Sequence, residues 1–146
     1  MNKAILIIII LAIIIVGLAA ILFWPKSKAP QNQPNPQPQA DIQVDAPTEG
    51  QLVTSPLTIS GIVRGNGWTG FEGQVGGVTL KDSLGNTLAQ GPLTATTDWM
   101  VLPTNFSTSL TFNAGSATTG QLIFHNENAS GDPAKDKTFT VNVKFQ

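Results

Sequence analysis

The pattern of apolar and polar positions divides the chain into three stretches that follow a short tail, residues 1–3. Residues 4–24 form an unbroken apolar run rich in Ile and Leu, and residues 25–40 are polar and hold five of the ten prolines. From residue 41 to residue 146, apolar and polar residues alternate with period two. This alternation predicts β-strands that bury one face and expose the other. The sequence therefore predicts an apolar helix, a linker and one all-β domain.

The apolar run is predicted to be a transmembrane helix. A helix of residues 4–24 rises about 1.5 Å per residue and so spans roughly 30 Å, the thickness of the hydrocarbon core of a bilayer. Trp24 ends the run, where an interfacial aromatic anchor is expected. A cleaved signal peptide is the alternative, but its apolar region would be about 7–15 residues long and would end at a small-x-small site. We therefore expect an uncleaved single-pass anchor.

The charges that flank this run do not orient it. Lys3 on one side balances Lys26 and Lys28 on the other once the terminal amine is counted. The surface composition of residues 41–146 is more informative, because Thr, Ser, Asn and Gly replace many of the charged residues that are usual in a globular domain. We therefore expect this part of the chain to be extracytoplasmic, at the cell membrane.

The linker at residues 25–40 reads PKSKAPQNQPNPQPQA. Its prolines favour polyproline II and forbid a helix. At about 3.1 Å per residue it extends to roughly 50 Å. It is either a spacer through a cell-wall layer or a tether of no particular length.

The domain at residues 41–146 is expected to contain about seven short strands. The last strand shows the clearest alternation, with Phe139, Val141, Val143 and Phe145 on one face. Turn chemistry separates the strands, and about seven strands in such a length predict an immunoglobulin-like antiparallel two-sheet sandwich, with a small closed barrel as the alternative. The other candidate strands centre on Ile42 and Val44, Leu57 to Val63, Val78 and Leu80, Leu88, Phe106 to Phe112, and Leu122 with Phe124.

Charge and cysteine content narrow the possible functions. The domain carries nine acidic and five basic residues, a net charge of −4, which argues against a nucleic-acid partner because such proteins show a basic stripe. The chain has no cysteine, which excludes disulfides, thiolate metal sites, a cysteine nucleophile and lipid attachment to cysteine.

Two tryptophans are the candidate ligand-binding residues. Trp68 and Trp99 lie in predicted loops rich in Gly and Thr, and Asp98 precedes the second of them. Exposed loop aromatics can anchor sugars or protein partners. The alternative is that one or both rings fold back to plug the ends of the sandwich.

No catalytic, cofactor or metal site is predicted. His125 is the single histidine, and it lacks the strand-turn-helix setting of a serine nucleophile. Glu72 and Asp98 are a remote candidate for a glycosidase pair, and nothing in the sequence sets their separation. Residues 126–137 imitate a calcium loop, but Lys137 stands where a bidentate Glu is required. A hydrolase is therefore the remote alternative.

Several motifs resemble those of one bacterial family. The stretch from Pro47 to Gly61 fits the pattern P-x-x-G-x-x-V-x-S-P-L-x-I-S-G, and Gly70-Phe71-Glu72 fits a following G-F-E. Asp82 and Gly85 fit a turn in the middle of the domain. These motifs are similar to the immunoglobulin-like domain of bacterial spore germination, from which the chain departs by inserting residues 65–69.

The resemblance implies an extracytoplasmic module without catalytic residues to carry over. The expected function is a membrane-anchored, non-catalytic module with a structural or protein-interaction role at the cell envelope. Its expected partners are the membrane and either an envelope protein or cell-wall glycan. A carbohydrate-binding module that uses Trp68 and Trp99 is the alternative.

Overall fold

The computed structural model describes residues 40–146. The predicted anchor and the linker as far as residue 39 lie outside the described residues. Within the described part of the chain, no helix is long and apolar enough to cross a bilayer. The described chain forms eight strands and one short 3₁₀ helix: β1 (Ile42–Ala46), β2 (Gln51–Val53), β3 (Leu57–Val63), β4 (Gln74–Asp82), β5 (Thr87–Ala95), β6 (Thr104–Leu110), β7 (Thr119–Asn126), η1 (Pro133–Lys135) and β8 (Thr138–Phe145).

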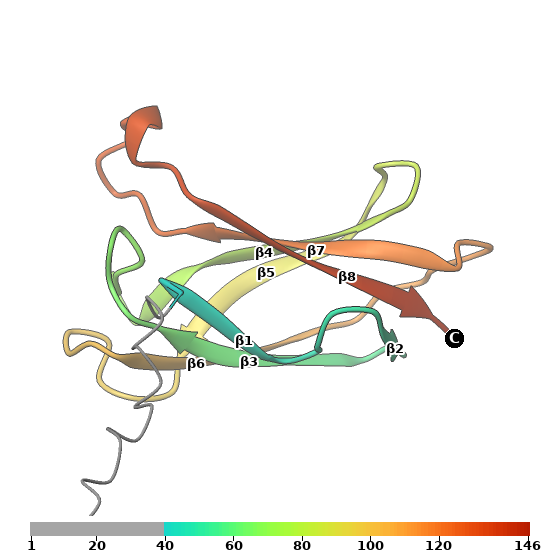
Figure 1. Ribbon diagram of the computed structural model, residues 1–146, viewed down its shortest axis with the longest axis horizontal. Helices are drawn as coiled ribbons and strands as arrows, with labels where there is room; N and C mark the ends of the chain where they lie inside the picture. The colour runs from blue at the N-terminus through green and yellow to red at the C-terminus, as the bar shows by residue number, and fades with distance from the viewer. Residues whose placement is uncertain (1–39) are drawn as a thin grey trace, which may run out of the picture. The chain divides into compact units, whose positions relative to one another are not determined.

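The eight strands form one continuous sheet that curls into two layers (Figure 1). Hydrogen-bonded neighbours run in the order β1-β3-β6-β5-β4-β7-β8-β2. The strand β5 joins the layers, because it pairs with β4 along most of its length and with β6 at Thr94 and Ala95. The all-β prediction is confirmed, but the two expected sheets are connected and the strands number eight rather than about seven.

The two edge strands of the sheet, β1 and β2, are consecutive in the chain. β1 runs antiparallel to β3, whereas β2 runs parallel to β8. The expectation of a wholly antiparallel sandwich is wrong at this second pair. The reason is that the chain crosses from one layer to the other between Ala46 and Gln51 and continues in the same direction.

The hydrophobic core lies between the layers and receives side chains from all eight strands. Phe106 on β6 and Phe124 on β7 meet across it, with ring centroids 6.5 Å apart. The buried apolar residues are Ile42, Val53, Leu57, Ile59, Val63, Trp68, Val75, Val78, Leu80, Leu93, Phe106, Leu110, Leu122, Phe124, Val141, Val143 and Phe145.

The alternation predicted for β8 is confirmed at Val141, Val143 and Phe145, which are buried. Phe139 is an exception, because its side chain is 37% exposed. It lies at the start of β8, where the layers open toward the end of the sandwich, and its ring is 6.2 Å from that of Phe124. A period-two pattern gives the side of the sheet on which a residue lies, but not how far the opposite layer extends over it.

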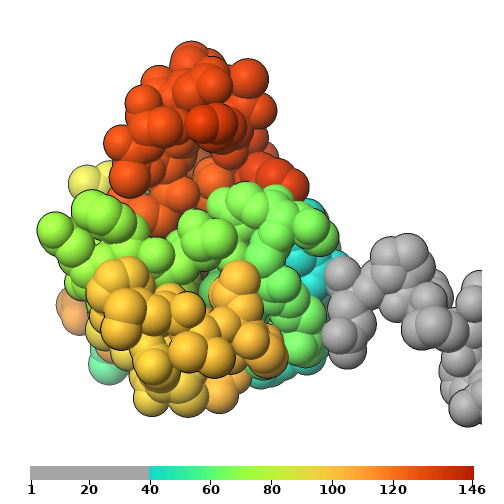
Figure 2. Space-filling model, turned by 90° about the vertical axis from the view of Figure 1, so that its left-hand side faces the viewer, coloured from blue at the N-terminus to red at the C-terminus, as the bar shows by residue number. Residues whose placement is uncertain are grey.

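Three connections gather at one end of the sandwich, which we call the loop end (Figure 2). They are the β3–β4 loop (residues 64–73), the β5–β6 loop (96–103) and the β7–β8 loop (127–137). The described chain also enters here, since the amide of Arg64 donates to the carbonyl of Asp41 over 2.8 Å.

Candidate functional site

Trp68, Trp99 and Asp98, the residues predicted to bind a ligand, all lie at the loop end, but they differ in loop and in exposure. Trp68 lies in the β3–β4 loop and is 2% exposed, so it belongs to the core. Its amide donates to the carbonyl of Gly65 over 3.0 Å in a tight turn. This burial is what the alternative, in which a ring plugs the end of the sandwich, expects of Trp68.

Side-chain hydrogen bonds from distant strands fix the loop around Trp68. The amide nitrogen of Asn126, at the end of β7, donates to the carbonyl of Gly67 over 2.8 Å and to that of Lys135 over 3.0 Å. Its side-chain oxygen accepts from the amide of Lys137 over 2.8 Å. The side chain of Asn126 thus joins the β3–β4 loop to the arm of the β7–β8 loop that leads into β8.

A second tie runs through Asp41, just before β1. Its carboxylate accepts from Asn66 Nδ2 over 2.7 Å and pairs with Lys137 Nζ at 3.3 Å. The hydrogen bond from Asn66 and then the one from Lys137 lower the pKa of Asp41 below its ordinary value. The side chains of Lys137 and Asp41 are 39% and 34% exposed, so solvent screens the attraction between them. The ion pair therefore contributes little to the stability of the fold through charge alone.

The β5–β6 loop, which carries Asp98 and Trp99, is held mainly by bonds within itself. The Asp98 carboxylate accepts from the amide of Met100 over 2.9 Å, so it orders its own turn. The buried hydroxyl of Thr104 donates to the carbonyl of Val101 over 2.9 Å. Trp99 is partly exposed. The ligand-binding role of Trp68, Trp99 and Asp98 stays a prediction, and among the three Trp99 is the aromatic that a ligand can reach.

Close backbone packing joins the two tryptophan loops. A Cβ atom at Gly70 would lie against the carbonyl oxygen of Trp99 and 2.9 Å from its Cβ. At Gly65 a Cβ atom would lie 3.5 Å from a methyl group of Leu102. The contact at Gly65 is an ordinary one, so Gly70 is the position where the crossing of the β5–β6 loop leaves no room for a side chain.

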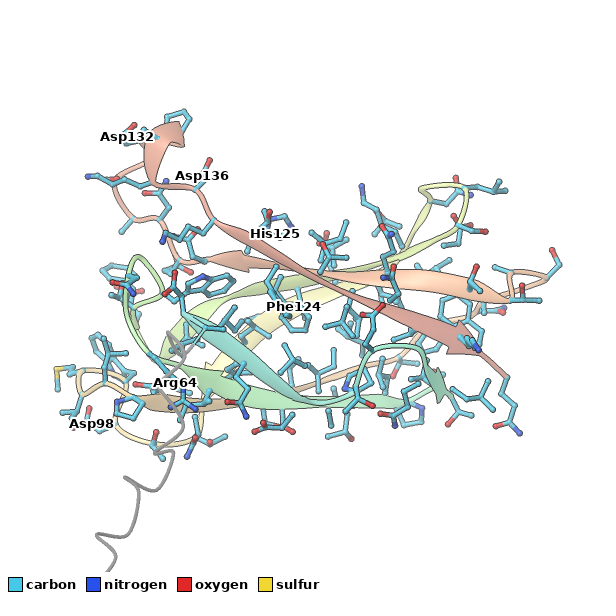
Figure 3. The ribbon with its side chains drawn as sticks, viewed as in Figure 1. Arg64, Asp98, Phe124, His125, Asp132 and Asp136 are labelled. Atoms are coloured by element: carbon cyan, nitrogen blue, oxygen red, sulfur yellow. The ribbon has the colours of Figure 1, made fainter. Side chains whose placement is uncertain are left out.

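The residues considered for hydrolysis are not assembled into one site. His125 lies on the exposed face of β7, whereas Asp98 lies at the loop end of the β1-β3-β6 layer (Figure 3). Glu72 lies in the β3–β4 loop, and no hydrogen bond found among residues 40–146 joins any two of the three. No group of three or more His, Asp or Glu side chains able to hold a metal ion occurs in this part of the chain.

The segment that imitates a calcium loop uses its polar groups to order itself. Asn128 Nδ2 donates to Asp136 Oδ1 over 2.6 Å and to the carbonyl of Asp132 over 2.8 Å. Ser130 Oγ donates to Asn128 Oδ1 over 2.7 Å, and the Asp132 carboxylate accepts from the amide of Ala134 at the start of η1. These contacts define a closed connection between β7 and β8.

The loop end also exposes apolar residues that were not predicted from the sequence as candidate site residues. Met100, Val101 and Leu102 are 72%, 60% and 40% exposed, and Phe71 in the neighbouring loop is 45% exposed. The signal is visible in the sequence, because Trp99 to Leu102 is a run of four apolar residues that breaks the alternation of the domain.

The topology defines the class of this protein. One layer carries β1, β3, β6 and the end of β5, and the other carries most of β5 with β4, β7 and β8. With β2 paired beside β8, this is the arrangement of an immunoglobulin-like sandwich. The model of one family, the immunoglobulin-like domain of bacterial spore germination, matches residues 41–144. The chain belongs to this family, and the predicted resemblance is confirmed. No curated protein was found to match the chain.

Proposed function

We propose that this protein is a single-pass, membrane-anchored module whose immunoglobulin-like domain is extracytoplasmic, does not catalyse a reaction and has a structural or protein-interaction role at the bacterial cell envelope. The observation that supports it best is the combination of a family match over residues 41–144 with a preceding run of uncharged residues at 4–24. The first supports the module, and the second supports its attachment to the membrane.

The polar groups of the loop end also favour a role in binding over one in chemistry. Asp41 and Asp98 are occupied in fixing turns and strand ends, and Asn126 and Asn128 are occupied in the same way. An acid–base catalyst needs a titratable group aimed at a place where substrate can lie. Side chains whose hydrogen bonds order the loops give a rigid surface instead. A partner binds such a surface with little loss of conformational entropy.

Attachment and orientation are tested on the full chain in a bacterial host. We expect the protein to stay in the membrane fraction after alkaline carbonate washing, with the mass of the uncleaved chain. Protease added to whole cells with the outer layers permeabilised should remove the domain. Release by carbonate, or a mass that lacks residues 4–24, would contradict the anchor, and a fully protected domain would contradict the orientation.

The partner class is tested with the compact unit from Pro38 to Gln146. Immobilised on beads, this unit should retain an envelope protein and should not hydrolyse peptidoglycan or a peptide library. A matched control uses the same unit after heat denaturation. Turnover of any of these substrates by the folded unit would overturn the non-catalytic assignment.

A carbohydrate-binding role is the second candidate, because the partly exposed Trp99 stands beside Asp98. A sugar-binding aromatic typically offers a flat ring next to polar groups. Replacing Trp99 by Ala should then abolish retention of the domain on isolated cell-wall glycan. Unchanged retention would remove this candidate, and the test needs no change at the buried Trp68.

A further inference from the structure

Five apolar residues on two adjoining loops of the loop end are exposed or partly exposed. The apolar cluster consists of Phe71 from the β3–β4 loop and Trp99, Met100, Val101 and Leu102 from the β5–β6 loop. Seven large apolar side chains are exposed in the described part of the chain, and four of them belong to this cluster. Such a concentration on one small surface marks an interaction site, because single exposed apolar residues are scattered on most proteins.

The tip of the β5–β6 loop is built so that its apolar side chains project from the domain. The Asp98 carboxylate accepts from the amide of Met100, and the amide of Val101 donates to the carbonyl of Asp98 over 3.3 Å. The Thr104 hydroxyl satisfies the carbonyl of Val101 at 2.9 Å. The turn is thus fixed by polar bonds on its inner side, which leaves Met100 and Val101 mostly in solvent.

The cluster lies at the same end of the sandwich at which the described chain begins. Asp41, the second described residue, bonds to Asn66 of the β3–β4 loop and is followed at once by β1. The sequence before it is the linker at residues 25–40 and then the apolar run at 4–24. The anchor proposed above is therefore attached to the end of the domain that carries the apolar cluster.

We propose that the apolar cluster docks into the interface of the same bilayer that holds residues 4–24, so that the domain rests loop end down on the membrane. The inference rests on the proposed anchor. Trp, Phe and Leu are side chains that favour the boundary between headgroups and acyl chains. Only the loop tip enters this boundary, and the sandwich stays in water.

The linker makes such weak docking effective. A cluster of five side chains would give a free domain little affinity, because binding must offset the loss of translational and rotational freedom. A tether of this length, extending to at most roughly 50 Å, keeps the cluster at an effective concentration in the millimolar range at the membrane. Docking then needs no further attractive group.

Charge decides the kind of lipid on which docking is strongest. Six acidic and three basic side chains lie at the loop end, and the acidic β7–β8 loop projects on the side away from the β5–β6 loop (Figure 2). Anionic headgroups repel this net negative charge, and salt screens the repulsion. The cluster is therefore suited to zwitterionic or uncharged lipid, whereas a basic amphipathic surface would prefer anionic lipid.

The test uses the absence of cysteine from the chain to place one fluorophore at a time. Full-length Met100→Cys, Ala134→Cys and Leu84→Cys variants are labelled with an environment-sensitive dye and reconstituted in phosphatidylcholine vesicles at a low protein-to-lipid ratio. Met100 lies in the apolar cluster, Ala134 in the β7–β8 loop of the same end, and Leu84, which is 86% exposed, in the β4–β5 turn at the opposite end.

We expect the dye at position 100 to emit at shorter wavelength and to be quenched several-fold more strongly by lipids brominated near the headgroup than the dyes at positions 134 and 84. Equal, water-like signals at all three positions would overturn docking. A wavelength shift at position 100 without lipid quenching would show that a second copy or another protein covers the cluster, and would also overturn it. Retention of the protein in the membrane after carbonate washing tests the anchor independently of docking. Failure of docking and failure of the anchor are therefore distinguishable.

A second measurement uses lipid composition. Replacing part of the phosphatidylcholine by phosphatidylglycerol should weaken quenching at position 100 at low salt, and high salt should restore it. Stronger quenching on the anionic vesicles would contradict apolar docking by an acidic end of the domain.

Discussion

The two tryptophan loops lie side by side, yet they are held in different ways. The loop with Trp68 is tied to distant parts of the chain, through Asn66 to Asp41 and through Gly67 to Asn126. The loop with Trp99 is ordered largely by contacts within a few residues of sequence. Long-range bonds accompany a ring that completes the core, and local bonds accompany a tip that faces outward. Hydrogen bonds to distant parts of the chain thus mark the loop whose tryptophan belongs to the core, and local hydrogen bonds mark the loop whose tip is exposed.

The largest expected effect is the loss of the Trp68 ring. Trp68→Ala should lower the free energy of unfolding by about 3–5 kcal/mol, because it removes a fully buried aromatic side chain and leaves a cavity. Trp99→Ala should cost no more than about 1 kcal/mol, since its ring is partly exposed. Urea unfolding of the two variants measures the difference. Equal losses would show that both loops contribute to the core alike.

A smaller effect is expected where the loops cross. Gly70→Ala should destabilise the domain by about 1–3 kcal/mol, because the new methyl group meets the backbone of Trp99. Gly77→Ala is the matched control: its Cβ would lie 3.7 Å from the nearest atom, an ordinary contact. Thermal unfolding of both variants makes the comparison. A Gly70 variant as stable as the Gly77 variant would mean that the β5–β6 loop moves aside without cost.

The smallest effect concerns the tie between Asp41 and the Trp68 loop. The pKa of Asp41 lies below its ordinary value of 3.8 in the folded state. A carboxyl with a lowered folded pKa stabilises the fold above its unfolded pKa, and this contribution is lost as the pH falls through the folded value. Asp41→Asn should therefore be less stable than the wild type near neutral pH, and the difference should shrink below pH 3.8.

Urea midpoints measured across this pH range test the prediction. Glu49 and Asp82, whose pKa values are lowered chiefly by hydrogen bonds from Asn142 and Asn86, remain in both proteins and cancel in the comparison. A difference between the two proteins that stays constant with pH would show that Asp41 acts through shape and not through its charge.

Much of the fold could be predicted from local pattern. The inward faces of β3 and β6 and three of the four apolar positions of β8 follow the period-two alternation, because each strand has one face against the opposite layer. The strand β5 was harder to predict: along Thr87–Ala95 one residue, Leu93, is fully buried. A strand that leaves one layer for the other has no constant inner face, so its pattern is weak. The short β2, whose partner is β8, likewise depends on a distant contact.

The candidate site was predicted in part. The sequence indicated that Trp68 and Trp99 lie in loops, but not which ring is buried, because that depends on Asn126 and Asp41, far away in the chain. Whether an apolar loop packs inward or faces solvent is decided by the space that the other loops leave.

The placement of β1 and β2 at opposite edges of the sheet has a mechanical consequence. The described chain enters at the loop end, and β8 finishes at the other end of the sandwich (Figure 1). A pull between these two points runs along the strands, so the backbone bonds that join β1 to β3 and β2 to β8 lie across the load. These bonds share the force in shear instead of opening one by one. A domain stretched between a fixed base and a distant attachment would therefore hold its shape under tension.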